Sequence, residues 1–283
     1  MSTPALVVEV SPLSLVKPGP EVEPEAKLKL SFQDGTAPGR CLEERFDFME
    51  KYRIEGFEPL GSDLISNAGK YIRLLRHRNI RISAVYSGYK GFILSQNKVV
   101  RDRYKTIIRD IIASAGELGS LGVVIAPGTN RQISGINKFL NEQLCELAEY
   151  AEKHYTTVIL EPLNKKESTG FHTVAEVAGI CRSVNRKGLR CMGDFWHMTG
   201  EEISDLNAFK SGGEYLSHVH IASRKTRYLP GTDGTSDNYI EGFKGLKEIK
   251  YKGFVSYECG INGDKAALVP ASINFLRRQW KSC

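Results

Sequence analysis

The chain has 283 residues, of which 41% are hydrophobic and 25% are charged, and its formal net charge is +6 at pH 7. This composition is typical of a globular protein with a large core, built as one big α/β domain or as two smaller ones. The basic residues are scattered among acidic ones, so neither a charged disordered tail nor a nucleic-acid-binding segment is predicted.

The N-terminus and the cysteines bear on the compartment. The segment MSTPALVVEVSPLSLV lacks the basic start and the apolar stretch of a signal peptide. The sequence contains no run of about 18 apolar residues, so no membrane span is predicted. The six cysteines form no C-x-x-C pair, a pattern that favours small core residues in a reducing compartment. We therefore expect a cytoplasmic protein without a membrane partner.

Residues 1–26 are rich in proline and glutamate and are expected to form an extended N-terminal extension. From residue 27 onward, apolar periodicity predicts strands and helices in alternation. The strands are expected at residues 27–33, 56–60, 79–86, 122–127, 156–162, 188–195, 214–222 and 253–259. The helices are expected at residues 41–52, 62–78, 99–119, 136–154, 173–185, 199–210, 241–250 and 264–280.

Eight strand–helix units in about 250 residues are the count and the length of a (β/α)8 TIM barrel. We expect this barrel to form the catalytic domain, residues 27–283. The alternative is an open doubly wound sheet, which usually carries a G-x-G-x-x-G turn after its first strand. Here that turn reads FQDGTAPGR, and the chain contains no G-x-x-x-x-G-K-[ST] phosphate loop.

Polar residues lie at the ends of the last four predicted strands. These residues are Glu161, Asp194, His220 and Glu258. In a TIM barrel the active site is formed at the C-terminal ends of the strands, so the four side chains should meet. Three carboxylates in one place repel one another unless a cation lies among them. Three carboxylates and one imidazole suit Mn²⁺, Mg²⁺ or Co²⁺, with Zn²⁺ and Fe²⁺ left open.

Four segments together carry a resemblance to a known family: LEPLNKKE, GDFWHM, HVHIA followed by RYLPG, and GFVSYEC. They resemble the xylose-isomerase-like sugar isomerase and epimerase barrels, and in particular the ketose 3-epimerases of the D-tagatose and D-psicose type. The resemblance implies that Glu161, Asp194, His220 and Glu258 bind one divalent metal ion, with Mn²⁺ favoured over Co²⁺, Mg²⁺ and Zn²⁺. It also implies that Glu161 and Glu258 form the acid–base pair.

The resemblance further implies substrate contacts. His197 and Glu167 match residues that face the substrate, and Arg227 matches an arginine that steadies it. Trp196 is a candidate for stacking on a sugar face, or else a buried aromatic residue. Glu58, near the end of the second strand, could reach the substrate or bond to a neighbouring loop.

The chain departs from the family pattern between His220 and Arg227. Ala222 and Ser223 stand where the family has Gly-Glu, and one extra residue is present. The loop that shapes the substrate pocket is therefore expected to differ. Arg224 is the alternative to Arg227, depending on where the extra residue falls.

These residues favour a divalent-metal-dependent sugar epimerase or aldose–ketose isomerase that removes and returns a proton next to a carbonyl through an enediolate. The alternatives are an inosose-type dehydratase or another metal-dependent lyase, an apurinic endonuclease and a non-catalytic sugar-binding barrel. The expected partner is a small sugar or sugar derivative rather than nucleic acid, and a homo-oligomer is left open. The sugar, its phosphorylation and the reacting carbon are also open.

Overall fold

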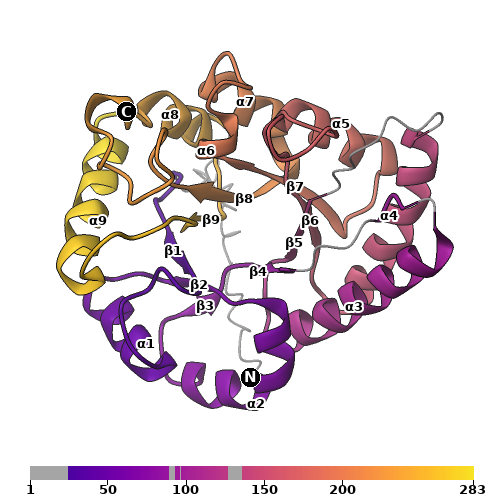
Figure 1. The fold of residues 1–283 in the computed structure, drawn as a ribbon, viewed down its shortest axis with the longest axis horizontal. Coiled ribbons are helices and arrows are strands. Elements are labelled where there is room, and N and C mark those ends of the chain that lie inside the picture. Colours follow the sequence, from indigo (N-terminus) through magenta and orange to yellow (C-terminus); the bar gives the residue numbers. More distant parts are fainter. Residues whose placement is uncertain (1–24, 89–92, 96, 127–135) are drawn as a thin grey trace, which may run out of the picture.

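The computed structural model describes residues 25–88, 93–95, 97–126 and 136–283. Its strands form a ring that is surrounded by helices (Figure 1). The strand order is β3-β2-β1-β9-β8-β7-β6-β5-β4, and all neighbouring strands are parallel. The predicted (β/α)8 barrel is confirmed, while the predicted N-terminal extension lies almost entirely outside the described residues.

The strands are β1 (Leu30–Gln33), β2 (Gly56–Glu58), β3 (Arg81–Ile82), β4 (Val85–Tyr86), β5 (Val123–Ile125), β6 (Val158–Leu160), β7 (Leu189–Asp194), β8 (Leu216–Ile221) and β9 (Phe254–Tyr257). The helices are α1 (Leu42–Lys51), α2 (Gly61–Leu75), α3 (Lys98–Glu117), α4 (Ile136–Lys153), α5 (Val174–Val184), α6 (Phe195–Met198), α7 (Asp205–Gly212), α8 (Ile240–Glu248) and α9 (Lys265–Lys281). Among the helices described, none combines the length and the apolar character needed to cross a lipid bilayer.

The third predicted strand, residues 79–86, is found as two short pieces. β3 pairs with β2, whereas β4 pairs with β5. The change of partner falls at Ser83, whose amide donates to Phe57, and at Val85, whose amide donates to Gly122. One continuous segment therefore bridges the two neighbours and completes the ring, which a periodicity pattern cannot indicate.

The predicted helix at residues 199–210 is wrong in its bounds. Two helices, α6 and α7, replace it, and residues 199–204 between them are not helical. The Asp194 side chain accepts from the Trp196 amide and begins α6, while the Ser204 side chain accepts from the Asn207 amide and begins α7. Gly200, with φ of +87°, lies in the segment that separates them.

Alternation along the strands separates two apolar regions. In β6, Val158 and Leu160 join the large core between the strands and the helices, because successive strand residues face opposite sides. Ile159 faces the other way, into a small cluster inside the ring with Ala84, Val124 and Met192. These side chains are at most 3% exposed. The inside of the ring thus contains a small buried apolar cluster.

Candidate active site

The four predicted metal ligands converge at the C-terminal ends of four neighbouring strands. Glu161 directly follows β6, and Glu258 directly follows β9. Asp194 in β7 and His220 in β8 are register partners. One possible ligand atom from each side chain lies within 4.8 Å of the others, a group that could hold a metal ion. Parallel pairing has brought the whole predicted set together.

His220 lies at the centre of this group. Its Nδ1 atom is 3.2 Å from Glu161 Oε1 and 3.2 Å from Glu258 Oε2, and the residue is only 1% exposed. Burial acts to lower the pKa of His220, but the charges of Glu58 and Glu258 outweigh it and hold this pKa well above the usual value. Without a metal ion, the imidazolium partly balances the carboxylates.

Asp194 is 1% exposed, and its two carboxylate oxygens differ in their hydrogen bonding. Oδ1 accepts a hydrogen bond of 2.8 Å from the Trp196 amide, whereas Oδ2 has no hydrogen-bond partner among the described residues. Burial raises the pKa of Asp194 to about 6, and the negative charges of Glu258 and Glu161 act in the same direction. The side chain therefore offers an unsatisfied oxygen to a cation.

The pKa of Glu258 is shifted in the opposite direction from that of Asp194. Burial acts to raise its pKa, yet the charge and hydrogen bond of His220 and the charge of Arg227 lower it to about 2. Gln33, at the end of β1, adds a hydrogen bond of 3.2 Å from its amide Nε2 to Glu258 Oε1. Sequence reasoning missed Gln33, although it stands at a strand end like the ligands.

His197 is buried beside Asp194, with its Nε2 atom 3.6 Å from Asp194 Oδ2. Its Nδ1 atom accepts a hydrogen bond of 3.2 Å from the Asn164 backbone amide. The Asn164 side-chain Nδ2 atom lies 2.9 Å from the same nitrogen. These contacts keep the proton of the neutral imidazole on Nε2, which faces Asp194. Asn164 belongs to the LEPLNKKE segment, but only the tertiary contact reveals its role.

Arg227 spans the predicted substrate side of the group. One guanidinium nitrogen is 2.8 Å from Glu258 Oε2, and the other is 3.5 Å from Glu167 Oε1. The guanidinium lies over the Trp196 ring, 4.3 Å from its centroid. Arg227 has a φ of +56°, an uncommon value for a residue with a side chain. The structure thus gathers Glu167, Trp196 and Arg227 beside the four-residue group.

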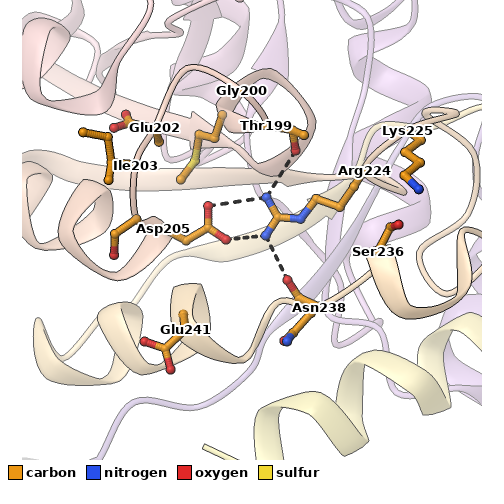
Figure 2. A pocket seen from close by; sticks show the side chains of 12 residues that line it. Thr199, Gly200, Glu202, Ile203, Asp205, Arg224, Lys225, Ser236, Asn238 and Glu241 are labelled. Atoms are coloured by element: carbon orange, nitrogen blue, oxygen red, sulfur yellow. Dashed lines mark hydrogen bonds and ion pairs between the residues drawn. The ribbon is translucent and has the colours of Figure 1, made fainter.

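Arg224, the alternative to Arg227, lines a separate cavity of about 450 Å³, where its guanidinium points toward Asp205 and Asn238 (Figure 2). It is paired with Asp205 and donates to the Asn238 carbonyl. Its guanidinium lies 4.9 Å from the centroid of the Phe195 ring and 5.0 Å from that of the Tyr239 ring. Arg224 therefore has a structural position, and Arg227 is the arginine beside the site.

The segment that departs from the family pattern forms a tightly bonded loop. Ser223 is fully buried and receives a hydrogen bond of 2.9 Å from the Tyr228 amide on its hydroxyl. Asp233 accepts from the amides of Lys225 and Thr226 at 2.7 Å and 2.9 Å. The hydroxyl of Ser223 thus bonds within the loop, and the loop holds the backbone that carries Arg227.

Glu58 lies behind His220 instead of on the substrate side. Both residues and His218 are at most 1% exposed. The Glu58 carboxylate is 3.0 Å from His220 Nε2 and 3.0 Å from His218 Nε2. This position does not favour the predicted substrate contact of Glu58.

The barrel and its rim define the class of protein. The model of the xylose isomerase-like TIM barrel family matches residues 45–279, and the chain belongs to this family.

Among curated proteins, the chain is similar to 3-dehydro-D-guloside 4-epimerase of Escherichia coli K12, with 28% identity over 79% of this chain and 89% of that protein. It is also similar to the D-psicose 3-epimerase of Ruminiclostridium cellulolyticum, with 31% identity over 41% of this chain and 39% of that protein. The crystal structure of apo 3-keto-D-glucoside 4-epimerase from E. coli superposes with a TM-score of 0.80 and 26% identity, covering 91% of this chain and 100% of that chain. These relatives support the predicted enzyme class, the sugar epimerases and isomerases.

Proposed function

We propose that the protein is a divalent-metal-dependent sugar epimerase that removes and returns a proton on a carbon next to a carbonyl. The observation that carries this proposal is the group of Glu161, Asp194, His220 and Glu258, in which Asp194 and His220 are buried and the two glutamates partly buried. Its chemistry, three carboxylates and one imidazole, is suited to binding a cation and moving a proton.

The residues fit a metal ion. Asp194 Oδ2 is buried without a hydrogen-bond partner among the described residues, and a cation would satisfy it. A bound divalent ion would supply Lewis-acid stabilisation of the negative charge that develops on the substrate oxygen. We propose one such ion held by the four side chains, with Mn²⁺ ahead of Co²⁺, Mg²⁺ and Zn²⁺ because oxygen ligands predominate.

Glu161 and Glu258 are the proposed acid–base pair. They follow β6 and β9, which face each other across the barrel opening in Figure 1. One carboxylate takes the proton from the carbon next to the carbonyl, and the other returns a proton to the opposite face of that carbon. The product is the epimer, and no co-substrate is consumed.

Four further side chains would orient the sugar: His197, Glu167, Arg227 and Trp196. His197 presents an N–H from a fixed ring, and Arg227 presents a guanidinium that is already ordered over Trp196. Such fixed donors lose little conformational freedom when a substrate binds. We propose that they contact substrate hydroxyl and carbonyl oxygens.

The proposed substrate is a keto-glycoside, with free ketoses as the second choice. The similarity to the E. coli 3-dehydro-D-guloside 4-epimerase extends over 89% of that protein, whereas the similarity to the D-psicose 3-epimerase extends over 39% of its chain. The bonded loop around Ser223 supports a pocket unlike that of the ketose 3-epimerases. The six cysteines are unpaired, which supports the proposal of a reducing, cytoplasmic compartment.

NMR in D₂O tests the reaction. Incubation of the Mn²⁺-loaded protein with 3-keto glycosides and ketoses should give an epimer that carries one deuterium at the inverted carbon. The variants Glu161→Gln and Glu258→Gln should each lower kcat by about 10² to 10⁴, because each removes one partner of the proton transfer.

A matched control is Glu152→Gln, whose carboxylate bonds Arg186 and the Gly188 amide at the opposite end of the barrel. It should keep its activity. Loss of water from the substrate would instead favour the dehydratase. Full activity of both Glu161→Gln and Glu258→Gln on every substrate would exclude the acid–base assignment.

A further inference from the structure

We propose that Glu58 is a positioning residue that holds His220 with its Nδ1 atom facing the metal ligands, and that His218 holds Glu58 in turn. This inference rests on the proposed metal site. It assigns a role to a carboxylate that lies too deep to face the substrate.

The contacts of Glu58 are bidentate and fully buried. His220 Nε2 lies 3.0 Å from Glu58 Oε1 and 3.1 Å from Oε2, and His218 Nε2 lies 3.0 Å from Oε2. The exposure of Glu58 and His218 is 0% and that of His220 is 1%. These hydrogen bonds are therefore shielded from bulk solvent.

The chemistry of the carboxylate determines where the protons lie. An ionised carboxylate only accepts hydrogen bonds, so both imidazoles must carry a proton on Nε2. Both Nε2 atoms lie within 3.1 Å of the Glu58 oxygens, so the carboxylate accepts from both imidazoles. Nδ1 of His220 then points to the side of Glu161 and Glu258, each 3.2 Å away. In the metal-free protein it donates to them, and after giving up that proton it could bind a metal ion held between them.

The backbone holds all three side chains in register. Glu58 ends β2, where its carbonyl accepts a hydrogen bond of 2.8 Å from the Asp34 amide. His218 and His220 are two residues apart in β8, so both point into the ring, and their ring planes meet at 84° with centroids 5.1 Å apart. The Nδ1 atom of His218 has no hydrogen-bond partner in the described ranges, so Glu58 is the polar group that His218 engages.

The same three side chains could be regarded as a second metal site, since their ligand atoms lie close together. The distances argue for hydrogen bonds. Both oxygens of Glu58 are already within 3.1 Å of imidazole nitrogens, which is the range of N–H···O contacts. An ion would have to break all of these contacts, whereas hydrogen bonding satisfies them as they stand.

A carboxylate behind a ligating histidine usually raises metal affinity, because it fixes the tautomer and the direction of the ring. Glu58→Gln tests this with little change in volume. A glutamine can accept from one imidazole, but its amide donates toward the other and opposes the Nε2–H tautomer. Competition with a chromogenic chelator should show that the dissociation constants for Mn²⁺ and Zn²⁺ rise by about 10- to 100-fold.

A control variant and an NMR measurement separate the proposed role of Glu58 from a purely structural one. Glu152→Gln removes the same charge at the other end of the barrel and should bind both metals as the unmodified protein does. Nitrogen-15 NMR of the Zn²⁺-loaded protein should show His220 with its proton on Nε2, and Glu58→Gln should change that signal. A purely structural role of Glu58 would alter stability without moving the tautomer.

The inference is overturned if Glu58→Gln binds both metals within threefold of the unmodified protein, or if metal-loaded His220 carries its proton on Nδ1. If Glu58→Gln fails to fold, two other measurements test the inference. One is the NMR spectrum of the unmodified protein, and the other is the metal affinity of His218→Phe, which removes one of the supports of Glu58. His218→Phe should weaken binding, and unchanged affinity would overturn the inference. If the unmodified protein binds none of Mn²⁺, Co²⁺, Mg²⁺ and Zn²⁺, the proposed metal site itself fails.

Discussion

At the scale of single residues, the candidate site combines a carboxylate that is poorly stabilised in the metal-free fold with one that is well stabilised. Asp194 has an oxygen without a partner and a raised pKa, whereas Glu258 receives hydrogen bonds or charge from His220, Arg227 and Gln33. Residues arranged for function often cost stability in this way. The cost should be measurable at Asp194.

Asp194→Asn should stabilise the metal-free protein at neutral pH. The pKa of Asp194 in the fold, about 6, lies above the ordinary 3.8, so folding becomes less favourable as the pH rises through this interval. The variant lacks this penalty and can keep the hydrogen bond to the Trp196 amide. Its unfolding free energy should exceed that of the unmodified protein by about 1–3 kcal/mol at pH 7.5, with the difference vanishing near pH 4.

Urea unfolding of both proteins at the two pH values, in the presence of a chelator, provides the measurement. Both proteins contain Glu258, whose lowered pKa gives stability that is lost only as the pH falls below the ordinary 4.5. The contribution of Glu258 therefore cancels in the difference between the two unfolding free energies. An Asp194→Asn protein that is equally stable or less stable at pH 7.5 would contradict the penalty assigned to this carboxylate.

At the scale of elements, the loop after β8 determines where Arg227 lies. Asp237 is 2% exposed and accepts hydrogen bonds from three backbone amides: Arg224 at 2.8 Å, Gly231 at 2.6 Å and Asp233 at 3.1 Å. One carboxylate therefore ties together both ends of a loop that contains a left-handed residue beside the site. The arrangement explains how the loop keeps its shape.

Asp237→Ala should loosen this loop and raise KM more than it lowers kcat, because Arg227 is proposed to orient the substrate and Glu161 and Glu258 to move the proton. The loss of the partner of three amides should also cost about 1–3 kcal/mol of stability. Steady-state kinetics and thermal unfolding are the measurements.

Asp264→Ala is the control for that variant, since its carboxylate caps α9 through a hydrogen bond of 2.9 Å to the Ala266 amide. It should cost about 1 kcal/mol and leave KM unchanged. Equal effects of the two substitutions on KM would mean that general destabilisation, and not the loop, governs substrate binding.

At the scale of the whole molecule, four strands from the second half of the chain supply the metal ligands, while β1 and β2 supply Gln33 and Glu58 from the first half. The β1–β9 and β1–β2 pairings bring these two halves together. A metal ion at the rim should therefore stabilise the folded barrel as a unit, because the ligands are scattered in the unfolded chain.

Mn²⁺ at 100 times its dissociation constant should raise the unfolding free energy by about 2.7 kcal/mol at pH 7.5. The gain should fall as the pH drops, because protons compete with the ion for His220, whose pKa is raised well above its usual value, and for Asp194, whose pKa is about 6. Calorimetric unfolding with and without Mn²⁺, at several pH values, measures both effects. A gain of the same size in Asp194→Asn would show that the ion binds elsewhere.

Much of the barrel and of its rim was predictable from local patterns. Alternating strands and helices indicate parallel pairing, and parallel pairing puts every strand end on one rim. The sequence alone therefore predicts that Glu161, Asp194, His220 and Glu258 meet. The helix at 199–210 failed because side-chain caps at Asp194 and Ser204, rather than apolar periodicity, determine where α6 and α7 begin.

The sequence by itself determined the order of the elements and the residues at the strand ends, because both follow from short-range patterns and a general rule of barrel architecture. Only the tertiary structure decided that Glu58 serves His220, that Asn164 orients His197, and that Arg227 faces the site while Arg224 does not. These contacts join residues that are distant in the chain, or depend on which way a loop turns. Such hydrogen bonds produce no periodic pattern of residue types, so the sequence does not predict them.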